Sequence, residues 1–379
     1  MRAAVFYGPG NIANEEVYCD FRHTPKEAVR SSTRTEGDIL LTVKACAVCG
    51  YDVRVYRNGH QKVAPPIILG HEICGQINKD IVVADSICSD EKHSIRHSIK
   101  AGERVVVSPI IPCLKCVYCH FGQYNLCLKL REIGSSINGG FAEFIKIPQE
   151  VLKIGGLVRV PDNLSDEEAA LLEPLACCLN GLYHMSPLIR KNEQGTVAII
   201  GDGPIGLLHL QLVRNIYYRN TVVIGRISER LQQAKSMGAN AIVPFASDAE
   251  FDRSLENALA LTDGVGFNVI IVATSNPVAL NFALKIASKN SCINIFAGMP
   301  KVANAFFSLD PNFLHYNQIS ITGSFSSTPC TLMQAVKLAS KGEINLSKLV
   351  THEYQLQDII KAILATEKYQ GLRMVINRF

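Results

Sequence analysis

The chain has 379 residues, of which 47% are hydrophobic and 19% charged, a composition typical of a globular protein with room for two domains. The formal charge of +4 is spread along the sequence without a basic block, so nucleic acid is not expected as a partner. The first apolar run ends at Gly8, too short for a signal peptide, and no apolar run reaches the roughly 18 residues of a membrane span. We therefore expect a cytoplasmic protein without a membrane partner.

Two early segments carry residue types that bind metal. The period-two alternation of apolar residues over 39–45 predicts a strand that leads to Cys49. A proline pair further on predicts an extended segment that leads to His71 and Glu72. Zinc accepts thiolate, imidazole and carboxylate ligands, and a catalytic zinc takes three of them and keeps a fourth position open. Neighbouring residues of a regular strand point to opposite faces, so Glu72 is a direct ligand only if the backbone is irregular, and otherwise a partner of one.

Other interpretations of this region remain. Cys49, His71 and Glu72 also fit a buried thiol, a hydrogen-bonded core histidine and a surface carboxylate. Cys46 forms a Cys-x-x-Cys pair with Cys49, but no thioredoxin-like helix opens there, so we interpret Cys46 as a packing residue. The polar segment 76–102, with His93 and His97, has no third ligand nearby and predicts a solvated loop.

Four closely spaced cysteines form the strongest pattern in the sequence: Cys113, Cys116, Cys119 and Cys127. Four thiolates at this spacing close a tetrahedral zinc shell, which is the composition of a structural site with no open position. The alternative is two disulfides, which suits a chain without an export signal poorly. The thirteen cysteines are an odd number and otherwise unclustered, so we expect reduced thiols and a zinc that stiffens a lobe near 109–130.

A carboxylate is predicted inside an apolar helix. Ser165 and Glu168 form a capping box that starts a helix, and the apolar residues that follow carry this helix on through Glu173. A carboxylate in so apolar a segment is costly unless it is paired or bound to a metal. Glu173 is therefore a candidate fourth partner at the zinc formed by Cys49, His71 and Glu72.

From residue 196 onward, predicted strands alternate with predicted helices. The strand 197–200 ends at a glycine motif that opens a helix, the context that a dinucleotide-binding fingerprint requires. In that motif Gly201 makes the turn, Gly203 lets backbone approach a pyrophosphate, and Gly206 permits close packing of helix on strand. The motif is completed by Pro204 and Ile205. Further strands at 222–224, 241–243, 268–272, 292–296 and 319–322 predict a six-stranded doubly wound sheet.

The end of the second of these strands bears on the choice of nicotinamide. An acid about 20 residues beyond the glycine motif accepts hydrogen bonds from the adenosine ribose of NAD and repels the extra phosphate of NADP. Here that position holds Gly225, and Arg226 follows with a guanidinium suited to phosphate. With Arg230 close behind, these residues favour NADP over NAD. The alternative is a solvated arginine and NAD bound through its pyrophosphate.

Together these motifs make the chain similar to the medium-chain zinc-dependent alcohol and polyol dehydrogenases along nearly its whole length. The matching segments are Cys49-Gly-x-Asp52, Gly70-His71-Glu72, Ala101-Gly-Glu-Arg-Val, the four cysteines, Gly140-Phe-Ala-Glu, Leu172-Glu173-Pro174 and the glycine motif. The resemblance implies an α/β protein: a GroES-like β-rich catalytic domain over 1–172, a doubly wound Rossmann domain over 173–317, and a return to the catalytic domain over 318–379. It also implies a homodimer or homotetramer.

The Leu172-Glu173-Pro174 segment resembles the sorbitol, sugar-alcohol and threonine dehydrogenase branch, because the alcohol dehydrogenase branch has a cysteine where Glu173 stands. In that branch Cys49, His71 and Glu72 hold a catalytic zinc, with Glu173 as ligand or water-mediated partner. The resemblance also implies that Asp52 hydrogen-bonds His71 and fixes its orientation. With the four-cysteine site this makes two zinc ions per chain. The catalytic zinc favours an alkoxide near neutral pH, which passes hydride to the nicotinamide.

Two residues depart from the family pattern. Tyr51 stands where the family commonly has a serine or threonine that touches the substrate hydroxyl. Arg54 stands where many members have a relay histidine, and an arginine does not release its proton at working pH. Arg54 is either solvated or meets an anionic group of the substrate, such as a phosphate.

We therefore predict an oxidoreductase that acts on a small-molecule alcohol or ketone, at a secondary alcohol of a polyol or sugar-like substrate. One alternative is an amino-alcohol dehydrogenase of the threonine type. The other is a nucleotide-binding member of the fold that has lost the reaction, for which Tyr51 and Arg54 are the motive.

Overall fold

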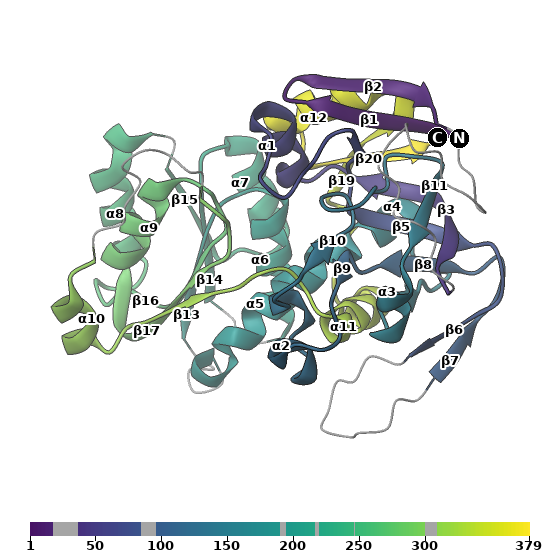
Figure 1. The fold of residues 1–379 in the computed structure, drawn as a ribbon. Coiled ribbons are helices and arrows are strands. Elements are labelled where there is room, and N and C mark those ends of the chain that lie inside the picture. The colour runs from purple at the N-terminus through teal and green to yellow at the C-terminus, as the bar shows by residue number, and fades with distance from the viewer. Residues whose placement is uncertain (18–36, 85–95, 190–194, 217–219, 246, 300–308) are drawn as a thin grey trace. The chain divides into compact units, whose positions relative to one another are not determined.

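The computed structural model describes residues 1–17, 37–84, 96–189, 195–216, 220–245, 247–299 and 309–379. These residues divide into two compact units, Met1–Cys177 with Ser326–Phe379, and Cys178–Phe325. The boundaries predicted from the sequence lie at 172/173 and 317/318. Figure 1 traces the chain from the purple N-terminus to the yellow C-terminus.

The first unit is built around a seven-stranded sheet. Its strands lie in the order β12-β8-β5-β3-β20-β19, and β11 also pairs with β3. Along β3, core residues alternate with half-buried ones over most of its length, so the predicted period of two is confirmed. The strands are β3 (Ile39–Ala47), β5 (Glu72–Ile77), β8 (Arg104–Val107), β11 (Phe144–Ile147), β12 (Leu157–Arg159), β19 (Val350–Gln355) and β20 (Arg373–Arg378).

Smaller elements complete this unit. The strands are β1 (Arg2–Gly8), β2 (Asn11–Glu16), β4 (Ile67–Ile68), β6 (Ile81–Ala84), β7 (Arg96–Ile99), β9 (Ile110–Ile111) and β10 (Arg131–Glu132). The helices are α1 (Gly50–Asn58), α2 (Val117–His120), α3 (Gln149–Lys153), α4 (Asp166–Ala170), α11 (Pro329–Ser340) and α12 (Ile359–Glu367), with short 3-10 turns at Tyr124–Leu126 and Leu356–Asp358. Among the described helices of both units, none combines the length and apolarity that a membrane span needs.

The segment 76–102 contains more regular structure than predicted. β6 and β7 pair antiparallel, with His97 opposite Val83, so the prediction of a solvated loop is wrong for these residues. Ile81, Val83 and Ile99 are buried, which shows that a short apolar alternation was hidden among polar neighbours. His93 lies outside the described residues.

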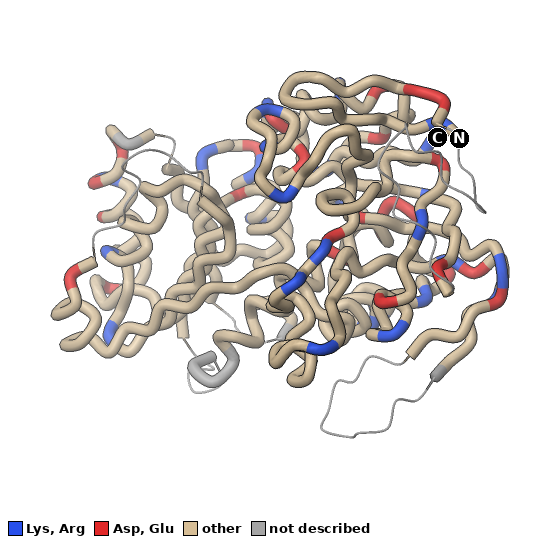
Figure 2. The backbone as a smooth tube through the Cα atoms, in the orientation of Figure 1, with Lys and Arg blue, Asp and Glu red and all other residues tan. Residues whose placement is uncertain are grey.

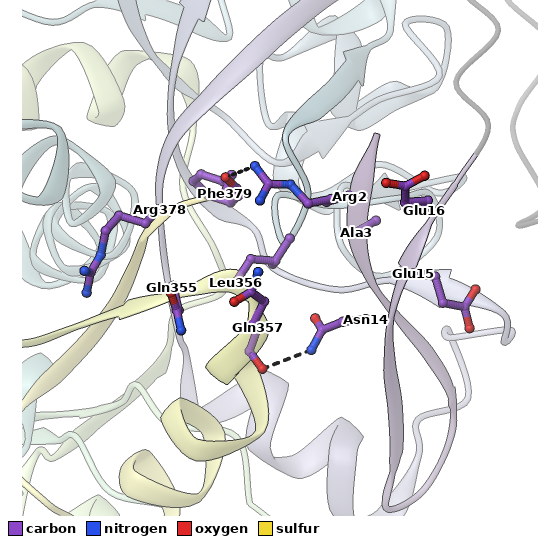
Figure 3. Close-up of a pocket in the computed structure, with 10 residues that line it drawn as sticks. All are labelled: Arg2, Ala3, Asn14, Glu15, Glu16, Gln355, Leu356, Gln357, Arg378 and Phe379. Atoms are coloured by element: carbon purple, nitrogen blue, oxygen red, sulfur yellow. Dashed lines mark hydrogen bonds between the residues drawn. The ribbon is translucent and has the colours of Figure 1, made fainter.

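The C-terminal strand returns to the middle of the main sheet. β20 pairs antiparallel with β3, with Val375 opposite Ala47 and Ile376 opposite Cys46. Figure 1 shows the purple strands β1 and β2 beside the yellow C-terminal elements. Between them lies a pocket, shown in Figure 3, that is lined by Arg2, Ala3, Asn14, Glu15, Glu16, Gln355, Leu356, Gln357, Arg378 and Phe379. None of the predicted metal ligands lines it.

The predicted capping box is present, but the helix it starts is shorter than expected. Ser165 Oγ accepts the Glu168 N–H at 3.1 Å, and Glu168 Oε2 accepts the Ser165 N–H at 2.9 Å. α4 ends at Ala170, and a new helix, α5 (Leu172–Ile189), begins after Leu171. Glu173 therefore lies in the first turn of α5, and the prediction of one continuous helix is wrong.

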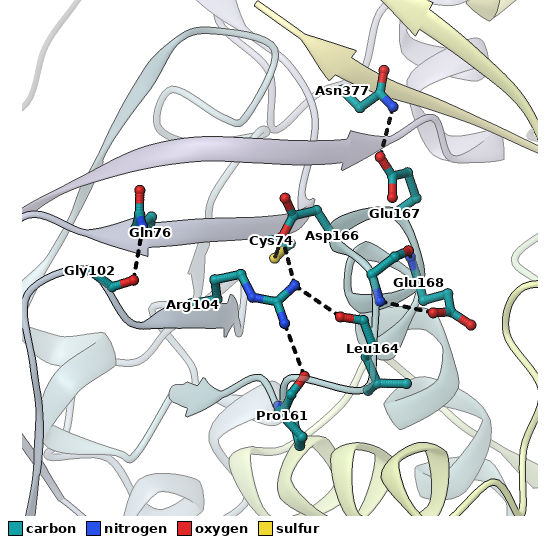
Figure 4. A network of polar contacts seen from close by, with 11 residues as sticks. Cys74, Gln76, Gly102, Arg104, Pro161, Leu164, Asp166, Glu167, Glu168 and Asn377 are labelled. Atoms are coloured by element: carbon teal, nitrogen blue, oxygen red, sulfur yellow. Dashed lines mark hydrogen bonds and ion pairs between the residues drawn. The ribbon is translucent and has the colours of Figure 1, made fainter.

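An arginine network fixes the loop before α4. Arg104 Nη1 donates to the Leu164 carbonyl at 2.9 Å and pairs with Asp166 Oδ1 at 3.0 Å, while Nη2 donates to the Pro161 carbonyl at 3.1 Å. Figure 4 shows these contacts converging from the loop onto one guanidinium. Because α5 follows α4 directly, this network anchors the segment that presents Glu173.

The second unit is a six-stranded parallel sheet in the order β15-β14-β13-β16-β17-β18. Its strands are β13 (Thr196–Ile200), β14 (Asn220–Gly225), β15 (Ala241–Pro244), β16 (Phe267–Val272), β17 (Ala287–Ile295) and β18 (Ser320–Gly323). Its helices are α6 (Pro204–Ile216), α7 (Ser228–Ser236), α8 (Phe251–Ala260), α9 (Pro277–Lys285) and α10 (Pro311–Asn317), with a 3-10 turn at Asp248–Glu250. The six predicted strands and the doubly wound order are confirmed. The order reverses at β13, and the carboxyl end of a strand at such a reversal is where ligands bind.

Charged residues of both signs are interspersed along the chain. Figure 2 shows Lys and Arg in blue and Asp and Glu in red, scattered over the described residues of both units. This distribution agrees with the small formal charge of +4.

Candidate metal centre and nucleotide-binding loop

Cys49, His71 and Glu72 come together at one point of the first unit. Each offers a ligand atom, and these atoms all lie within 4.8 Å of one another. Cys49 is the N-cap of α1, directly after β3, and Glu72 is the first residue of β5, opposite Ala47 of β3. Gly70, with φ of +90°, supplies the irregular backbone just before His71. The structure therefore brings a thiol, an imidazole and a carboxylate together at one point.

Asp52 acts on the backbone around these residues. It is fully buried, and its Oδ2 accepts the Cys49 N–H at 2.9 Å, while Oδ1 accepts the Gly70 N–H at 3.3 Å. Its Oδ1 lies 3.9 Å from His71 Nδ1, which is too long for the hydrogen bond that the resemblance implies. Burial raises the pKa of Asp52, and the nearby His71 opposes that rise. Asp52 therefore ties together the two chain segments that present the ligands.

Glu173 lies close enough to His71 and Glu72 for its charge to interact with theirs. It is only 4% exposed, and its Oε1 accepts a weak bond from the Cys177 thiol at 3.2 Å. The pKa of Glu173 is raised to about 7, chiefly by burial and also by Glu72, while His71 opposes the rise. It is not among the three residues whose ligand atoms meet within 4.8 Å, so its place is beside that group.

Arg373 is a buried cation at this point that the sequence did not reveal. Its Nη1 lies 3.1 Å from Glu72 Oε1, with only 4% and 1% of the two side chains exposed. Nη1 also donates to the Val48 carbonyl at 3.1 Å. Burial alone lowers the pKa of Arg373, but Glu72 and Cys49 raise it by more. The sequence offered one signal, an arginine directly before the apolar run Met374–Ile376.

Tyr51 connects the group to a surface histidine. Its hydroxyl lies 2.9 Å from Ser135 Oγ and 3.3 Å from His60 Nδ1, and its ring lies edge-on to His71 at 5.8 Å between centroids. Burial raises the pKa of Tyr51 to about 12, while Ser135 lowers it. His60 is exposed and Ser135 is buried, so the Tyr51 side chain lies between His71 and the surface at His60; sequence analysis did not select Ser135 or His60. Arg54 is also exposed.

The four cysteines form a second group, around α2. Their sulfur atoms lie 3.5 Å (Cys116 to Cys119), 3.9 Å (Cys116 to Cys127) and 4.0 Å (Cys113 to Cys119) apart. A tetrahedral shell with zinc–sulfur distances near 2.3 Å has sulfur atoms about 3.8 Å apart. All four thiols are reduced, so the alternative of two disulfides is not present. Elsewhere, Cys330 is disulfide-bonded, an exception to the expectation of reduced thiols.

The pKa values of two of these thiols are shifted in opposite directions, and a cation is needed to stabilise all four as thiolates. A backbone N–H from Leu128 lowers the pKa of Cys116 to about 6, whereas burial raises that of Cys119 to about 12. The N–H groups of Cys113 and Lys129 point at Cys127 Sγ, at 3.1 and 3.4 Å. Four thiolates this close require a cation among them, and the donor set fits zinc.

The glycine motif forms a tight turn at the carboxyl end of β13. Gly201 has φ of +128°, and a side chain at Gly206 would lie 1.8 Å from the Gly201 carbonyl oxygen. Gly203 is open, with Arg230 Nη1 of α7 as the nearest atom at 3.9 Å from its Cβ position. Pro204 and Ile205 begin α6. This arrangement leaves backbone accessible to a pyrophosphate, as the motif predicts.

The sequence predicts that no acid lies at the end of β14, and the structure differs from that prediction. Arg226 is exposed after β14, but Gly225 is not an empty position. The side chain of Asp202, from the glycine motif itself, reaches across to it, and its Oδ2 accepts the N–H groups of Arg226 and Ile227 at 2.8 and 2.6 Å. A carboxylate therefore lies at the end of β14, supplied by a residue that the sequence did not single out.

Comparisons with known proteins cover both units. One family model, described as alcohol dehydrogenase GroES-like domain, matches residues 35–161, and a second, described as zinc-binding dehydrogenase, matches residues 204–341. The chain is 30% identical over 326 residues to D-arabitol-phosphate dehydrogenase of Enterococcus avium, covering 86% of this chain and 85% of that protein.

Solved structures share the fold over almost the full chain. A zinc-binding dehydrogenase from Sinorhizobium meliloti 1021 bound to NADP has a TM-score of 0.79 and 26% identity, covering 99% of this chain and 98% of that one. An alcohol dehydrogenase from Escherichia coli CFT073 in complex with NADH has a TM-score of 0.79 and 26% identity, covering 100% of this chain and 99% of that one. The predicted pairing of a GroES-like domain with a Rossmann domain is confirmed.

Proposed function

This chain belongs to the zinc-dependent medium-chain alcohol dehydrogenase family, and on that premise we propose that it moves hydride between a secondary alcohol of a polyol or sugar-like substrate and a nicotinamide cofactor. The observation that carries the proposal is the meeting of the Cys49 thiol, the His71 imidazole and the Glu72 carboxylate within 4.8 Å. These are the donor types of a catalytic zinc with an open position.

Each side chain of the candidate metal site in the first unit has a separate role. Cys49, His71 and Glu72 hold the zinc, which when bound lowers the pKa of a substrate hydroxyl. Asp52 fixes the backbone on both sides of the site. Glu173, buried with its pKa raised to about 7, orders the water or hydroxyl beside the ligands.

Arg373 and Tyr51 set the charge and the hydrogen bonding around these ligands. Arg373 balances the negative charge of Glu72 and holds that carboxylate in place. The Tyr51 hydroxyl takes the place of the usual serine or threonine, and its contacts with Ser135 and His60 fix its position while its ring lies against His71. A phenol whose pKa is about 12 keeps its proton at neutral pH and donates a hydrogen bond.

The second zinc is structural. Cys113, Cys116, Cys119 and Cys127 have the separations of a closed tetrahedral shell, so we propose two zinc ions per chain. The family also supports a homodimer or homotetramer and a cytoplasmic location, and both are part of the proposal.

The relatives guide the choice of substrate and leave the cofactor open. D-arabitol-phosphate dehydrogenase, the relative named above, acts by its name on a phosphorylated polyol, which supports a polyol for this chain. Arg54, exposed on α1, offers a cation for such a phosphate. The solved neighbours carry NADP in one case and NADH in the other. Arg226 supports NADP, whereas the Asp202 carboxylate opposes it.

The experiment that tests the proposal joins metal analysis to a substrate screen. Purified protein should contain two zinc ions per chain. Polyols, their phosphates and the matching ketones should be screened with NAD and NADP while the absorbance of the reduced nicotinamide is followed. One zinc per chain and no turnover with any alcohol would leave a nucleotide-binding protein without the reaction.

A further inference from the structure

The position that should select between NAD and NADP is already filled by another residue. A Cβ built on Gly225 would lie 2.5 Å from Asp202 Cβ, 2.6 Å from Asp202 Cγ and 2.7 Å from Asp202 Oδ2. Any side chain at residue 225 would start in space that the Asp202 carboxylate occupies. Gly225 is therefore required by close packing, and its lack of a side chain does not mean that the site lacks an acid.

The contact follows from the parallel pairing of the two strands. β13 and β14 pair from Thr196 with Asn220 to Ile200 with Ile224, so both chains leave the sheet at the same edge. Asp202 is the second residue beyond β13, and Gly225 is the residue that ends β14. Residues far apart in sequence thus share the carboxyl edge where a dinucleotide binds.

The carboxylate is held firmly and keeps one oxygen for a ligand. Asp202 is 8% exposed, and its Oδ2 accepts two backbone N–H groups, from Arg226 and Ile227, at the start of α7. Both hydrogen bonds that Asp202 accepts among the described residues go to Oδ2, which leaves Oδ1 as an acceptor. An ionised acid that faces a glycine motif accepts hydroxyl protons well and repels a phosphate.

We propose that Asp202 is the ribose-binding acid of this chain and that it selects NAD over NADP. This inference rests on the proposed nicotinamide-dependent function and revises the preference for NADP that Gly225 and Arg226 indicate in the sequence. Asp202 Oδ1 accepts a hydrogen bond from an adenosine ribose hydroxyl, and the same charge opposes the 2′-phosphate of NADP. The Arg226 backbone is held by Asp202, while its side chain is exposed to solvent.

Binding titrations test the inference without turnover. NADH and NADPH should be titrated by fluorescence against the full chain and against Asp202→Asn. Asparagine keeps the size of the side chain and one oxygen that accepts the Arg226 and Ile227 N–H groups, but removes the charge. We expect the unmodified protein to bind NADH at least about 10-fold more tightly than NADPH, and Asp202→Asn to shrink that ratio by about 10-fold or more.

Controls separate this role from general charge and from folding. Glu229→Gln removes an equal charge from an exposed position in the first turn of α7 and should leave the ratio unchanged. Thermal unfolding of Asp202→Asn should stay close to that of the unmodified protein. Tighter binding of NADPH by the unmodified protein, or a ratio that Asp202→Asn does not change, overturns the inference while leaving the proposed function intact. Failure to bind either dinucleotide overturns both.

Discussion

Glu72 and Arg373 form an ion pair of 3.1 Å in which both side chains are almost completely buried. Such a pair costs desolvation energy on both sides, and its two charges are stable only together. The pair also joins the start of β5 to the start of β20, which are 301 residues apart in sequence. The charge next to the candidate zinc site is therefore controlled by the last strand of the main sheet.

Arg373→Met should destabilise the first unit, because it leaves the Glu72 carboxylate buried without its cation. The expected loss is about 3–5 kcal/mol of unfolding free energy, measured by denaturant unfolding at matched zinc content. Arg57→Met is the control, since the Arg57–Glu367 pair lies at the surface and should contribute little. An Arg373→Met protein as stable as the unmodified one would show that the zinc alone balances Glu72.

Cys49→Ala should abolish turnover and leave the fold intact, because the catalytic zinc loses one of three ligands. His71→Ala should do the same. Zinc analysis should fall from two ions per chain to one, and circular dichroism should be unchanged. Full activity in Cys49→Ala would place the catalytic centre elsewhere.

Cys116→Ala should act on stability instead. A closed four-thiolate site contributes its metal-binding energy directly to folding, so loss of one ligand should lower the unfolding temperature and the yield of soluble protein. Any enzyme that still folds should keep measurable turnover per catalytic zinc. A Cys116→Ala protein with normal stability would argue against a structural metal in this lobe.

Glu173→Ala should reduce turnover strongly, since a carboxylate beside the ligands orders the water or substrate hydroxyl. Glu173→Gln serves as the matched variant, because it keeps an oxygen for the Cys177 thiol but removes the charge. If the charge matters, both variants should be slow with near-normal unfolding temperatures. A normal rate in Glu173→Gln would make Glu173 a residue of the α5 start only.

His209 gives the second unit a pH-dependent stability. It lies on α6, fully buried against Phe296, and neither ring nitrogen has a hydrogen-bond partner among the described residues. Burial lowers its pKa from 6.5 to about 3. Between these values the unfolded chain binds a proton that the folded chain does not, so stability falls as the pH falls below 6.5 and is unaffected above it.

The unfolding free energy should therefore drop by about 2 kcal/mol between pH 7 and pH 5 through this residue, at roughly 1.4 kcal/mol per pH unit below the unfolded-state pKa. His209→Met fills the same apolar space without a proton and should remove most of that drop. Substitution of the exposed His315 by Gln is the control and should not. Denaturant unfolding at both pH values gives the comparison, and an equal drop in His209→Met would assign the effect to other groups.

Much of the candidate site could be predicted from the spacing of residues along the sequence. The four cysteines and the glycine motif lie within short segments, so their separations could be predicted from the chain alone. Cys49 and His71 could be grouped because the predicted strand over 39–45 leads to the first and the extended segment after the proline pair leads to the second. The break at Leu171 had a local signal that the sequence interpretation missed, because Pro174 has no N–H for the carbonyl of residue 170 and fits only the first turn of a new helix.

The missed residues depend on long-range pairing. Arg373 reaches Glu72 because β20 pairs with β3 in a particular register, and no local pattern encodes that register. Asp202 meets Gly225 only through the pairing of β13 with β14. In the sequence, Gly225 indicates that the ribose-binding acid is absent, whereas in the fold Gly225 leaves space for the Asp202 carboxylate.

The position of β20 also constrains how the protein is made. A ribosome delivers residues 373–378 after the whole of the nucleotide-binding unit, yet they pair with β3, whose residues left the ribosome about 330 positions earlier. Until then β3 is unpaired at Cys46 and Ala47, beyond the part of the same edge that β11 covers, and such unpaired edges recruit other strands. The nucleotide-binding unit, which is continuous in sequence from Cys178 to Phe325, can fold during that interval. Truncation before Arg373 should therefore yield chains that aggregate through β3, even though the glycine motif and all candidate zinc ligands are present.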